Sequence, residues 1–583
     1  MILAAAILVS FLAVRGFRFD ITFSGFELVN TESFIWLLLM IFFICVIIRS
    51  RKETDKRLKA YSALFSILIA LFYCLGISFE KKEAIHWIWE SRNALLNYLN
   101  LFFSHLVLYY CCSFLLFQFL RDHPAAPVAN GRINFSVRKI LLYWGLLLIA
   151  YIPWYLYCYP ANMTYDSAAQ VYDAIHVEKL SDHHSAFLDL VLRCILLPVE
   201  KLTGSLQIGI GIISFLQMLL MTFTFALCFE RITHYIRIPL VKGLIFAWFA
   251  FYPGNTLFSF TIWKDILFSL CFLGLLLCVD SAAENETLFF HSKKSLFWLA
   301  FTLTLLPLIR HNGILIVILL PIFFLLRFRS FTRQILTVTG IICAVLCIWN
   351  YLLCPLLNVE RVGSGLILSL PQQQMARAIS EHYEQISSED LSLYDSWYDS
   401  PEIWRDYNGI IADPVKDHFR TSQFQQNPGA FFSLWLKLAG RYPVTYLEAV
   451  LHNTFGYWFP ETQYWTTFYG VILGQQIGDI HAAPIYKSWI VDKIYNWHAY
   501  HHDLKIPLLP LLFSRGACWW VWLFCGCWCL YQNRKKFILF LPGLLLWLSI
   551  LPSPVYNEYR YVYGLFIGLP LLLSASLRNC RRK

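Results

Sequence analysis

The sequence is poor in charge. Charged residues make up only 14% of its 583 residues, whereas hydrophobic residues make up 58%. A soluble domain carries about a quarter charged residues, so this composition excludes the ordinary soluble class. Segments in which apolar and polar residues strictly alternate are also lacking, which excludes a transmembrane β-barrel. Continuous apolar runs near the length that crosses a bilayer, about 20 residues, recur instead. We therefore expect a multi-pass, all-α membrane protein.

The sequence also lacks the marks of a cleaved signal peptide and of a cysteine framework. The first apolar run, 1–14, has neither a basic segment nor a small-residue cleavage site, so we expect a retained helix. Most of the 17 cysteines lie inside apolar runs, as between Cys518 and Cys529, where no histidine or acidic residue accompanies them. This setting is typical of small buried hydrophobic side chains and not of metal ligands.

The apolar runs predict a polytopic helix bundle of about fourteen spans. Clusters of arginine and lysine follow spans two, four, six, ten and twelve, and the chain ends in a basic tail. Since basic loops stay in the cytoplasm, we expect a cell-membrane protein with both termini cytoplasmic. The candidate spans are roughly 1–14, 33–49, 60–78, 96–120, 139–157, 206–229, 242–262, 266–280, 295–309, 313–326, 333–354, 511–531, 537–552 and 561–577.

This orientation places two long segments outside the cytoplasm, 158–205 and 355–510. Residues 355–508 carry 16 acidic and 10 basic side chains, a net charge of −6, so the rest carries +16 to reach the total of +10. Membrane topology thus explains the basic balance, and nucleic acid is not an expected partner. The expected parts are an N-terminal transmembrane region 1–138, a transmembrane core 139–354, an extracytoplasmic segment or small domain 355–510, and C-terminal helices with the basic tail 511–583.

Five polar clusters fall on the predicted outer face, and the first contains Asp166, Asp182, His183 and His184. Asp166 is suited to act as a general base that takes a proton from an acceptor hydroxyl. The alternative is that it caps a short helix beginning at Ser167. The histidines and carboxylates could bind a divalent metal. Adjacent histidines on a helix rarely point to one centre, so we favour neither a metal nor another cofactor.

The second and third clusters lie at the ends of spans. Lys264 can hold a phosphate as a point charge, or else it and Asp265 neutralise each other. Arg310 and Asn312 belong to a tight turn between two spans, where the positive-inside rule disfavours a basic residue. Arginine is the side chain best suited to bidentate phosphate contacts. The alternative is a structural ion pair, for which Asp265 is the nearest acidic candidate.

The fourth cluster lies in the long outer segment 355–510, and the fifth lies at the outer start of the last span. Gln373 and Arg377 lie early in the outer segment, where glutamine amides can bind sugar hydroxyls; the alternative is an ordinary amphipathic helix. Glu558 and Arg560 precede the last span, where either can face a cavity; the alternative is an interfacial aromatic belt with a surface ion pair. Tryptophan and tyrosine are frequent in the same outer loops and suit sugar rings and interfacial anchoring equally well.

Six segments, taken together in their order, resemble an uncharacterised bacterial branch of the GT-C superfamily. These are integral-membrane glycosyltransferases that use lipid-phosphate-linked sugars. The resemblance covers roughly 140–580, and 1–138 looks like an added N-terminal region. The segments are Met163–Ser167, Asp182–His184, Trp263–Asp265, Arg310–Gly313, Pro371–Gln374 and Glu558–Tyr561.

The resemblance implies that Asp166 matches the catalytic acidic residue of the first outer loop. A tandem pair of acidic residues is lacking, so Asp182 is a rival base. A polyprenyl-phosphate leaving group needs cationic stabilisation, for which Lys264, Arg310, Arg377 and Arg560 are candidates. The expected activity transfers a sugar from a polyprenyl-phosphate-linked donor to a cell-surface glycan, lipid or protein on the outer face, with membrane lipids as further partners.

Three other classes fit parts of the pattern. A transporter or flippase of lipid-linked saccharides places its ionisable residues near the middle of the membrane, on broken helices. A glycan polymerase or ligase shares a large outer loop and outer arginines with a transferase. A non-catalytic scaffold has no need of a charged group in each outer turn. A cavity open to both membrane and solvent, with Asp166 on its wall, distinguishes the transferase.

Overall fold

The computed structural model describes residues 7, 9–10, 34–123, 136–176, 180–361, 368–462, 470–471, 477–499, 509–551 and 557–578. Within these ranges the chain forms helices, and β-type pairing is confined to isolated bridges such as Asn162 with Thr261. Seven helices are long and apolar enough to cross a membrane, which confirms a multi-pass helical membrane protein. They are Lys56–Lys82, Arg92–Asp122, Val137–Tyr157, Leu206–Thr233, Lys264–Glu284, Arg329–Leu356 and Tyr559–Leu577.

Other predicted spans are shorter in the structure. The run 242–262 forms α9 (Pro239–Phe251) and the short α10 (Pro253–Phe258), because Pro253 lacks the amide that would continue α9. The run 537–552 contains α26 (Leu541–Leu548), a helix of only 8 residues. The predicted first span, 1–14, lies almost entirely outside the described residues.

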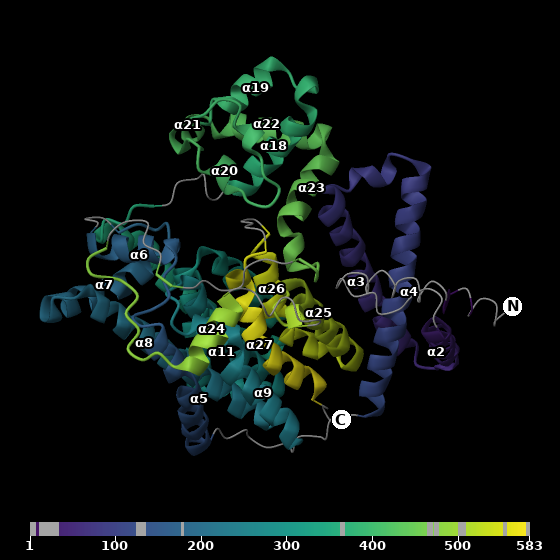
Figure 1. Ribbon diagram of the computed structural model, residues 1–583, viewed down its shortest axis with the longest axis horizontal. Helices are drawn as coiled ribbons and strands as arrows, with labels where there is room; N and C mark the ends of the chain where they lie inside the picture. Colours follow the sequence, from purple (N-terminus) through teal and green to yellow (C-terminus); the bar gives the residue numbers. More distant parts are fainter. Residues whose placement is uncertain are drawn as a thin grey trace.

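The centre of the molecule is the pair α11 (Lys264–Glu284) and α27 (Tyr559–Leu577), seen in Figure 1. Glycines allow these two helices to approach closely. A Cβ atom at Gly568 of α27 would lie 2.5 Å from Leu276 Cδ1 of α11. Further helices pack around the pair: α8 (Leu206–Thr233), α13 (Lys293–Ile309) and α25 (Arg515–Gln532).

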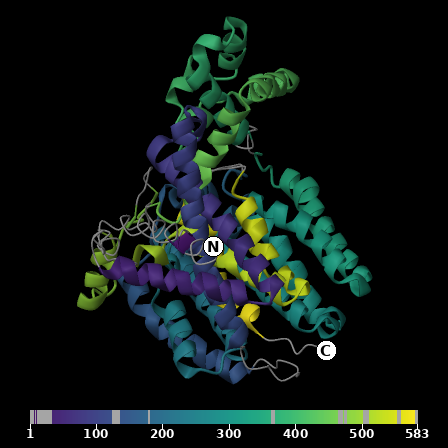
Figure 2. The ribbon, with the colours of Figure 1, turned by 90° about the vertical axis from the view of Figure 1, so that its right-hand side faces the viewer.

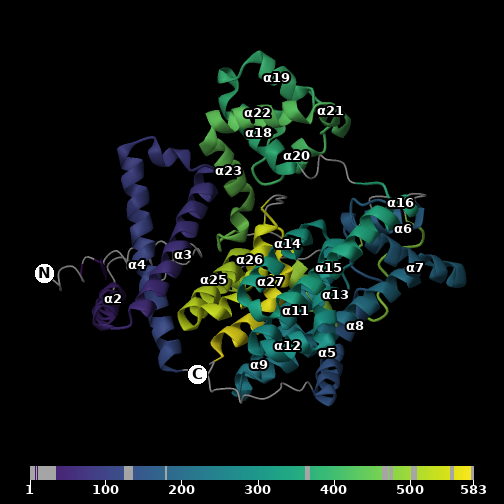
Figure 3. The same cartoon turned by 180° about the vertical axis from the view of Figure 1, so that it is seen from behind.

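Two helical layers complete the core on its sides. Behind it, α15 (Thr332–Ile348) packs on α13, and α14 (Ile314–Arg327) packs on α26 (Figure 3). The N-terminal hairpin of α3 (Lys56–Lys82) and α4 (Arg92–Asp122) contacts α25, and Figure 2 shows α2 (Phe34–Lys52) lying across it. On the opposite side, α5 (Val137–Tyr157) packs on α8.

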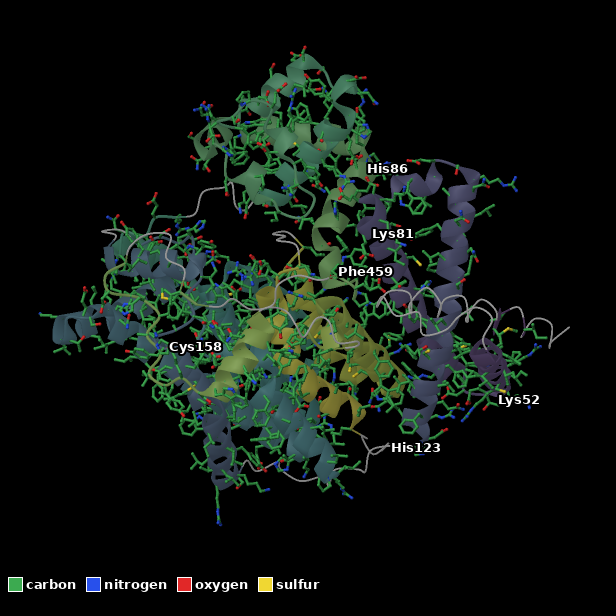
Figure 4. The ribbon with its side chains drawn as sticks, viewed as in Figure 1. Lys52, Lys81, His86, His123, Cys158 and Phe459 are labelled. Carbon is green, nitrogen blue, oxygen red and sulfur yellow. The ribbon has the colours of Figure 1, made fainter. Side chains whose placement is uncertain are left out.

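A separate helical unit rises above one end of the bundle (Figure 1). It has its own hydrophobic core, which includes Tyr394, Trp397 and Phe431. At that same end of the hairpin lie Lys81 and His86, while Lys52 and His123 lie at the other end (Figure 4). The helices of this unit are α18 (Ser369–His382), α19 (Ser388–Asp395), α20 (Asp413–Lys416), α21 (Thr421–Gln426), α22 (Pro428–Arg441) and α23 (Pro443–Thr454).

Candidate functional site

Asp166 lies in the first turn of α6 (Tyr165–His176), and the structure shows how the chain positions this turn. The helix is capped by Thr164, whose hydroxyl accepts a hydrogen bond from the Ser167 amide at 3.3 Å. The Trp263 indole donates to the same hydroxyl at 2.5 Å, which joins α6 to the start of α11. Thr164 therefore supplies the cap that the sequence alternative assigned to Asp166, and the Asp166 carboxylate is available for other partners.

The beginnings of α11 and α27 bring four further charged residues to Asp166. Lys264 and Asp265 form the first turn of α11, and Asp265 is buried. Glu558 precedes α27, where its amide donates to the Tyr457 hydroxyl at 2.9 Å, and Arg560 follows in the first turn. The pair α11 and α27 packs side by side, so charges at the two helix starts become neighbours.

Arginines link these carboxylates. Arg560 forms an ion pair with Asp166. The same guanidinium lies 3.9 Å from Asp265, and its Nε lies 3.5 Å from Glu558. Arg310 approaches Asp265 from the turn after α13, with 2.6 Å between Nη1 and Oδ1. We call Asp166, Lys264, Asp265, Arg310, Glu558 and Arg560 the Asp166 cluster.

Aromatic rings form one wall of the Asp166 cluster. The Arg310 guanidinium carbon lies 3.9 Å from the centre of the Tyr561 ring, and that of Arg560 lies 4.8 Å from the Trp263 ring. Such rings attract cations and hold a planar guanidinium in one orientation. The arginines are thus fixed in place, while the Asp166 side chain stays 40% exposed. The cluster is accessible at Asp166 and rigid behind it.

The protonation states differ among neighbouring groups. Burial opposes ionisation of Asp166, but the charge and hydrogen bond of Arg560, together with His184 and Lys264, lower the pKa of Asp166 below its ordinary value. Burial raises the pKa of Glu558 to about 7, although Arg560 and Arg515 act in the other direction. Burial, with Lys264 nearby, lowers the pKa of His184 to about 4. At neutral pH the cluster therefore holds an ionised Asp166 and a titrating Glu558, and the nearby His184 is uncharged.

The remaining members of the first and third predicted clusters lie near this group. Asp182 contacts the turn after α13, where His311 Nε2 lies 3.0 Å from its carbonyl oxygen and 3.7 Å from its carboxylate. The His183 and His184 rings meet edge to face at 4.7 Å. The Asn312 amide donates to the Ser549 carbonyl at 3.1 Å, so its described contact is to backbone.

Two predicted site residues lie elsewhere, in the separate helical unit. Gln373 donates to the Ile411 carbonyl at 3.5 Å. Arg377 is buried between Glu381 and Glu448, at 2.8 and 3.2 Å, and donates to the Glu83 carbonyl of the N-terminal hairpin at 2.9 Å. The contact of Arg377 with Glu83 joins the unit to the hairpin, and neither Gln373 nor Arg377 lies in the Asp166 cluster.

One group among the described residues has the spacing of metal ligands. Ligand atoms of His86, Glu381 and Glu448 all lie within 4.8 Å of one another. Both carboxylates are already paired with Arg377, and a guanidinium between two acids competes with a metal cation. This group lies with Arg377, apart from the Asp166 cluster.

Arg515 and Asp189 are two charged neighbours that the sequence interpretation missed. Arg515 begins α25, lies 5.4 Å over the Tyr559 ring and acts electrostatically on Glu558. The available signal was similar to the one used for Arg310, a basic residue near one end of an apolar run. Asp189 is buried in the first turn of α7 (Ala186–Thr203), where burial raises its pKa to about 7.

Comparisons with known proteins identify one family. A family model described as a family of unknown function, DUF6020, matches residues 174–583. No curated protein and no solved structure matches the chain. The match covers five members of the Asp166 cluster and begins after the sixth, Asp166 itself. Because it spans more than half of the 583 residues, the chain belongs to the DUF6020 family.

Proposed function

We propose that this protein is an integral-membrane glycosyltransferase. It moves a sugar from a polyprenyl-phosphate-linked donor to a cell-envelope acceptor at the outer face of a bundle of about fourteen spans with cytoplasmic termini. The observation that carries the proposal is the meeting of an ionised carboxylate, Asp166, with Lys264, Arg310 and Arg560 at the starts of two apolar helices. Transfer of a sugar from a lipid phosphate requires a base next to an anion-binding site, and both must lie at the membrane boundary.

The chemistry assigns a role to each group. Asp166 takes the proton of an acceptor hydroxyl, whose oxygen attacks the anomeric carbon of the donor sugar. The bond between that carbon and the phosphate oxygen breaks, and polyprenyl phosphate leaves with the electron pair. Arg310, Arg560 and Lys264 stabilise the negative charge that develops on the leaving phosphate. The aromatic wall of Trp263 and Tyr561 holds both arginines in position.

The Asp166–Arg560 ion pair fits this sequence of events. Without donor, Arg560 neutralises Asp166 and keeps its pKa low, which makes the carboxylate a weak base. A phosphate that binds Arg560 competes with Asp166 for the guanidinium. The carboxylate then loses its partner and gains proton affinity as the donor arrives. Base activation is thereby coupled to donor binding.

The position of the charges favours a transferase over a transporter. Lys264, Asp265 and Arg560 all lie in the first turns of their helices. A transporter of lipid-linked saccharides carries such groups at broken helices near the membrane midplane. A polymerase or ligase would share the boundary position, and its product distinguishes it, since it joins saccharide chains and a transferase adds one sugar.

The test is transfer by purified protein in lipid nanodiscs. Polyprenyl-phosphate-linked sugars are supplied with cell-envelope extract as acceptor, and released polyprenyl phosphate and glycosylated product are measured by mass spectrometry. Asp166→Asn should lower the rate by about 10²–10⁴ with unchanged thermal unfolding. Asp173→Asn, which removes a carboxylate from the same helix α6, is the matched control and should keep the wild-type rate.

Asp182→Asn separates the two candidate bases. Loss of transfer in this variant alone, with full activity in Asp166→Asn, would move the base to Asp182. Wild-type rates in both variants, or ATP-free movement of intact lipid-linked saccharide across the bilayer without cleavage, would contradict the proposal.

A further inference from the structure

Helix α24 (Trp489–Ala499) exposes several large apolar side chains on one face, with Lys493 among them. Trp489, Ile490, Ile494 and Trp497 are 69%, 59%, 42% and 37% exposed. Their spacing places them on one side of an α-helix. Ile485 and Tyr486, just before the helix, are exposed as well and extend the apolar surface. So large an apolar surface requires a partner.

The other face of α24 is attached to the end of the membrane-spanning helix α5. Asp492 accepts a hydrogen bond from the Tyr157 hydroxyl at 2.6 Å, and the Tyr157 and Tyr495 rings lie 5.1 Å apart. Val491 on the same face is buried. Since these contacts fix the rotation of α24 about its axis, the exposed apolar face has a definite direction.

The segment before α24 is fixed to the same place by its backbone. The Ile485 amide donates to the Leu156 carbonyl at 2.9 Å, and the Ala483 amide donates to the Tyr159 carbonyl at 3.0 Å. Cys158, labelled in Figure 4, marks this end of α5. The chain from 483 to 499 therefore runs along the end of a span and not away from it into solvent.

Helix α5 has an exposed apolar surface of its own. α5 is apolar enough to cross a membrane, and its outward side chains include Leu142 and Ile149 at 58% and 69% exposed. α24 is 11 residues long, about half of what is needed to cross a bilayer. A short helix held at the end of such a span has its apolar face at the level where acyl chains meet headgroups.

The polar residues of this helix match that level of the membrane. Lys487 and Lys493 are exposed, and the Lys493 ammonium lies 4.3 Å from the centre of the Trp489 ring. Tryptophan and tyrosine favour the headgroup region, and lysine beside an apolar face attracts anionic phospholipids. The same composition makes a protein partner less suitable, since a protein interface disfavours exposed lysine at its core.

We propose that α24 lies flat in the membrane–water interface, at the end of α5 marked by Cys158. Its face of Trp489, Ile490, Ile494 and Trp497 inserts among the lipid acyl chains, and Lys487 and Lys493 contact anionic headgroups. The occupant of this surface is the phospholipid leaflet. This inference is independent of the proposed transferase activity, because none of its residues belongs to the Asp166 cluster.

Photo-crosslinking in nanodiscs of phosphatidylethanolamine and phosphatidylglycerol tests the proposal. Benzoylphenylalanine replaces Ile490 or Ile494 in the full chain, and adducts are identified by mass spectrometry. Lipid adducts should form as readily as at Ile149 of α5. Ser392, an exposed residue of α19 in the separate helical unit, is the negative control and should give none. Adducts of position 490 with a second copy of the chain, or only with water, would overturn the proposal.

The headgroup contact has its own readout. The substitutions Lys487→Gln and Lys493→Gln are added to the protein that carries benzoylphenylalanine at position 490. They should lower the ratio of phosphatidylglycerol adducts to phosphatidylethanolamine adducts by about half or more, and the total yield of adducts should not change. An unchanged ratio would refute the role of the lysines. Arg441→Gln with Lys437→Gln, on α22 of the separate unit, is the matched charge control and should leave the ratio as it is.

Discussion

Two clusters of arginine and carboxylate lie at opposite ends of the same two helices. The Asp166 cluster occupies the starts of α11 and α27, with Asp265 and Arg560. At their other ends, Arg231 Nε lies 2.6 Å from Asp280, the Tyr235 hydroxyl lies 2.5 Å from the same carboxylate, and Arg578 lies 3.5 Å from Glu284. We call Arg231, Tyr235, Asp280, Glu284 and Arg578 the Asp280 cluster.

The two clusters differ in how far their central carboxylates are exposed to solvent. Asp280 and Arg231 are 2% and 3% exposed, and the carboxylate is shared by Arg231 of α8, Tyr235 just after α8 and Arg578 at the end of α27. Asp166 is 40% exposed and has its ion-pair partner, Arg560, on one side. Similar residue types thus form one closed and one partly open network. A closed network joins helices, whereas an open one leaves charges that a ligand can reach.

The largest expected difference between the two clusters is the side of the membrane from which each is reached. An epitope tag inserted after Ser392, in the unit above the Asp166 cluster, should bind antibody in intact cells. A tag after Lys583, beyond the Asp280 end, should bind only after permeabilisation. The positive-inside distribution of basic residues is the physical reason. The reverse pattern would place the Asp166 cluster in the cytoplasm and remove the basis for a lipid-linked donor.

Next in size is a difference in stability. Asp280→Asn removes the buried carboxylate that pairs with Arg231 and Arg578 and leaves Glu284 as their remaining counter-ion. Breaking a buried ion pair typically costs about 3–5 kcal/mol. Thermal unfolding in detergent should show a marked loss for this variant. Asp166→Asn should unfold within a few degrees of the wild type, because the Asp166 side chain is partly solvated. Equal losses in the two variants would show that both clusters are structural.

The sequence predicted the helical membrane class, and its candidates included all six residues of the Asp166 cluster, for a physical reason. Apolar runs such as 60–78 cannot fold otherwise in a membrane, and the structure has α3 over Lys56–Lys82. Charged residues in the turns between such runs must lie at the membrane boundary. Lys264, Arg310 and Arg560 were found in this way, and the structure brings them together.

The sequence could not distinguish a charge that serves a site from one that serves the fold. Arg231 is one of the basic residues after predicted span six, which the sequence analysis used only to orient the chain, but its contact with Asp280 joins residues 49 positions apart. Arg377 was grouped with the site, yet its contact with Glu448 joins residues 71 apart. Spacing along a chain does not reveal such pairs. The pair of Arg310 with Asp265 was foreseen as an alternative, and the structure confirms that contact.

A smaller effect concerns Arg310. Arg310→Lys keeps the charge and loses the planar fork, so affinity for the polyprenyl-phosphate donor should fall. The Arg310→Ala variant should lose more donor affinity than Arg310→Lys, since each charge-assisted hydrogen bond contributes about 1.5–3 kcal/mol. Donor binding is measured by microscale thermophoresis, with thermal unfolding recorded in parallel.

A double-mutant cycle with Asp265→Asn decides between the two roles of Arg310. Asp265 also lies 3.9 Å from Arg560, so Asp265→Asn disturbs two arginines. The Arg560→Lys variant is therefore measured as a reference, to show how much of the effect of Asp265→Asn comes through Arg560. Strong coupling in stability, with unchanged donor binding in the single variants, would make Arg310 a structural residue like Arg231.

The smallest expected effect is a pH dependence that only the open cluster can show. Burial raises the pKa of Glu558 to about 7, so this carboxyl is protonated below neutral pH and ionised above it. Its ionised form lies 3.5 Å from Arg560 and competes with the donor phosphate. Donor affinity should therefore fall as pH rises from 6 to 8, by about three- to tenfold, where tenfold corresponds to 1.4 kcal/mol.

Other groups at the site do not titrate between pH 6 and 8. A sugar phosphodiester keeps its charge in this range. Asp166, with its lowered pKa, stays ionised, and His184, with its pKa of about 4, stays neutral. Glu558→Gln should abolish the dependence and bind at the low-pH affinity throughout. Asp189→Asn is the control, because burial also raises the pKa of Asp189 to about 7; loss of the dependence in that variant alone would assign the titration to α7 and not to the arginines.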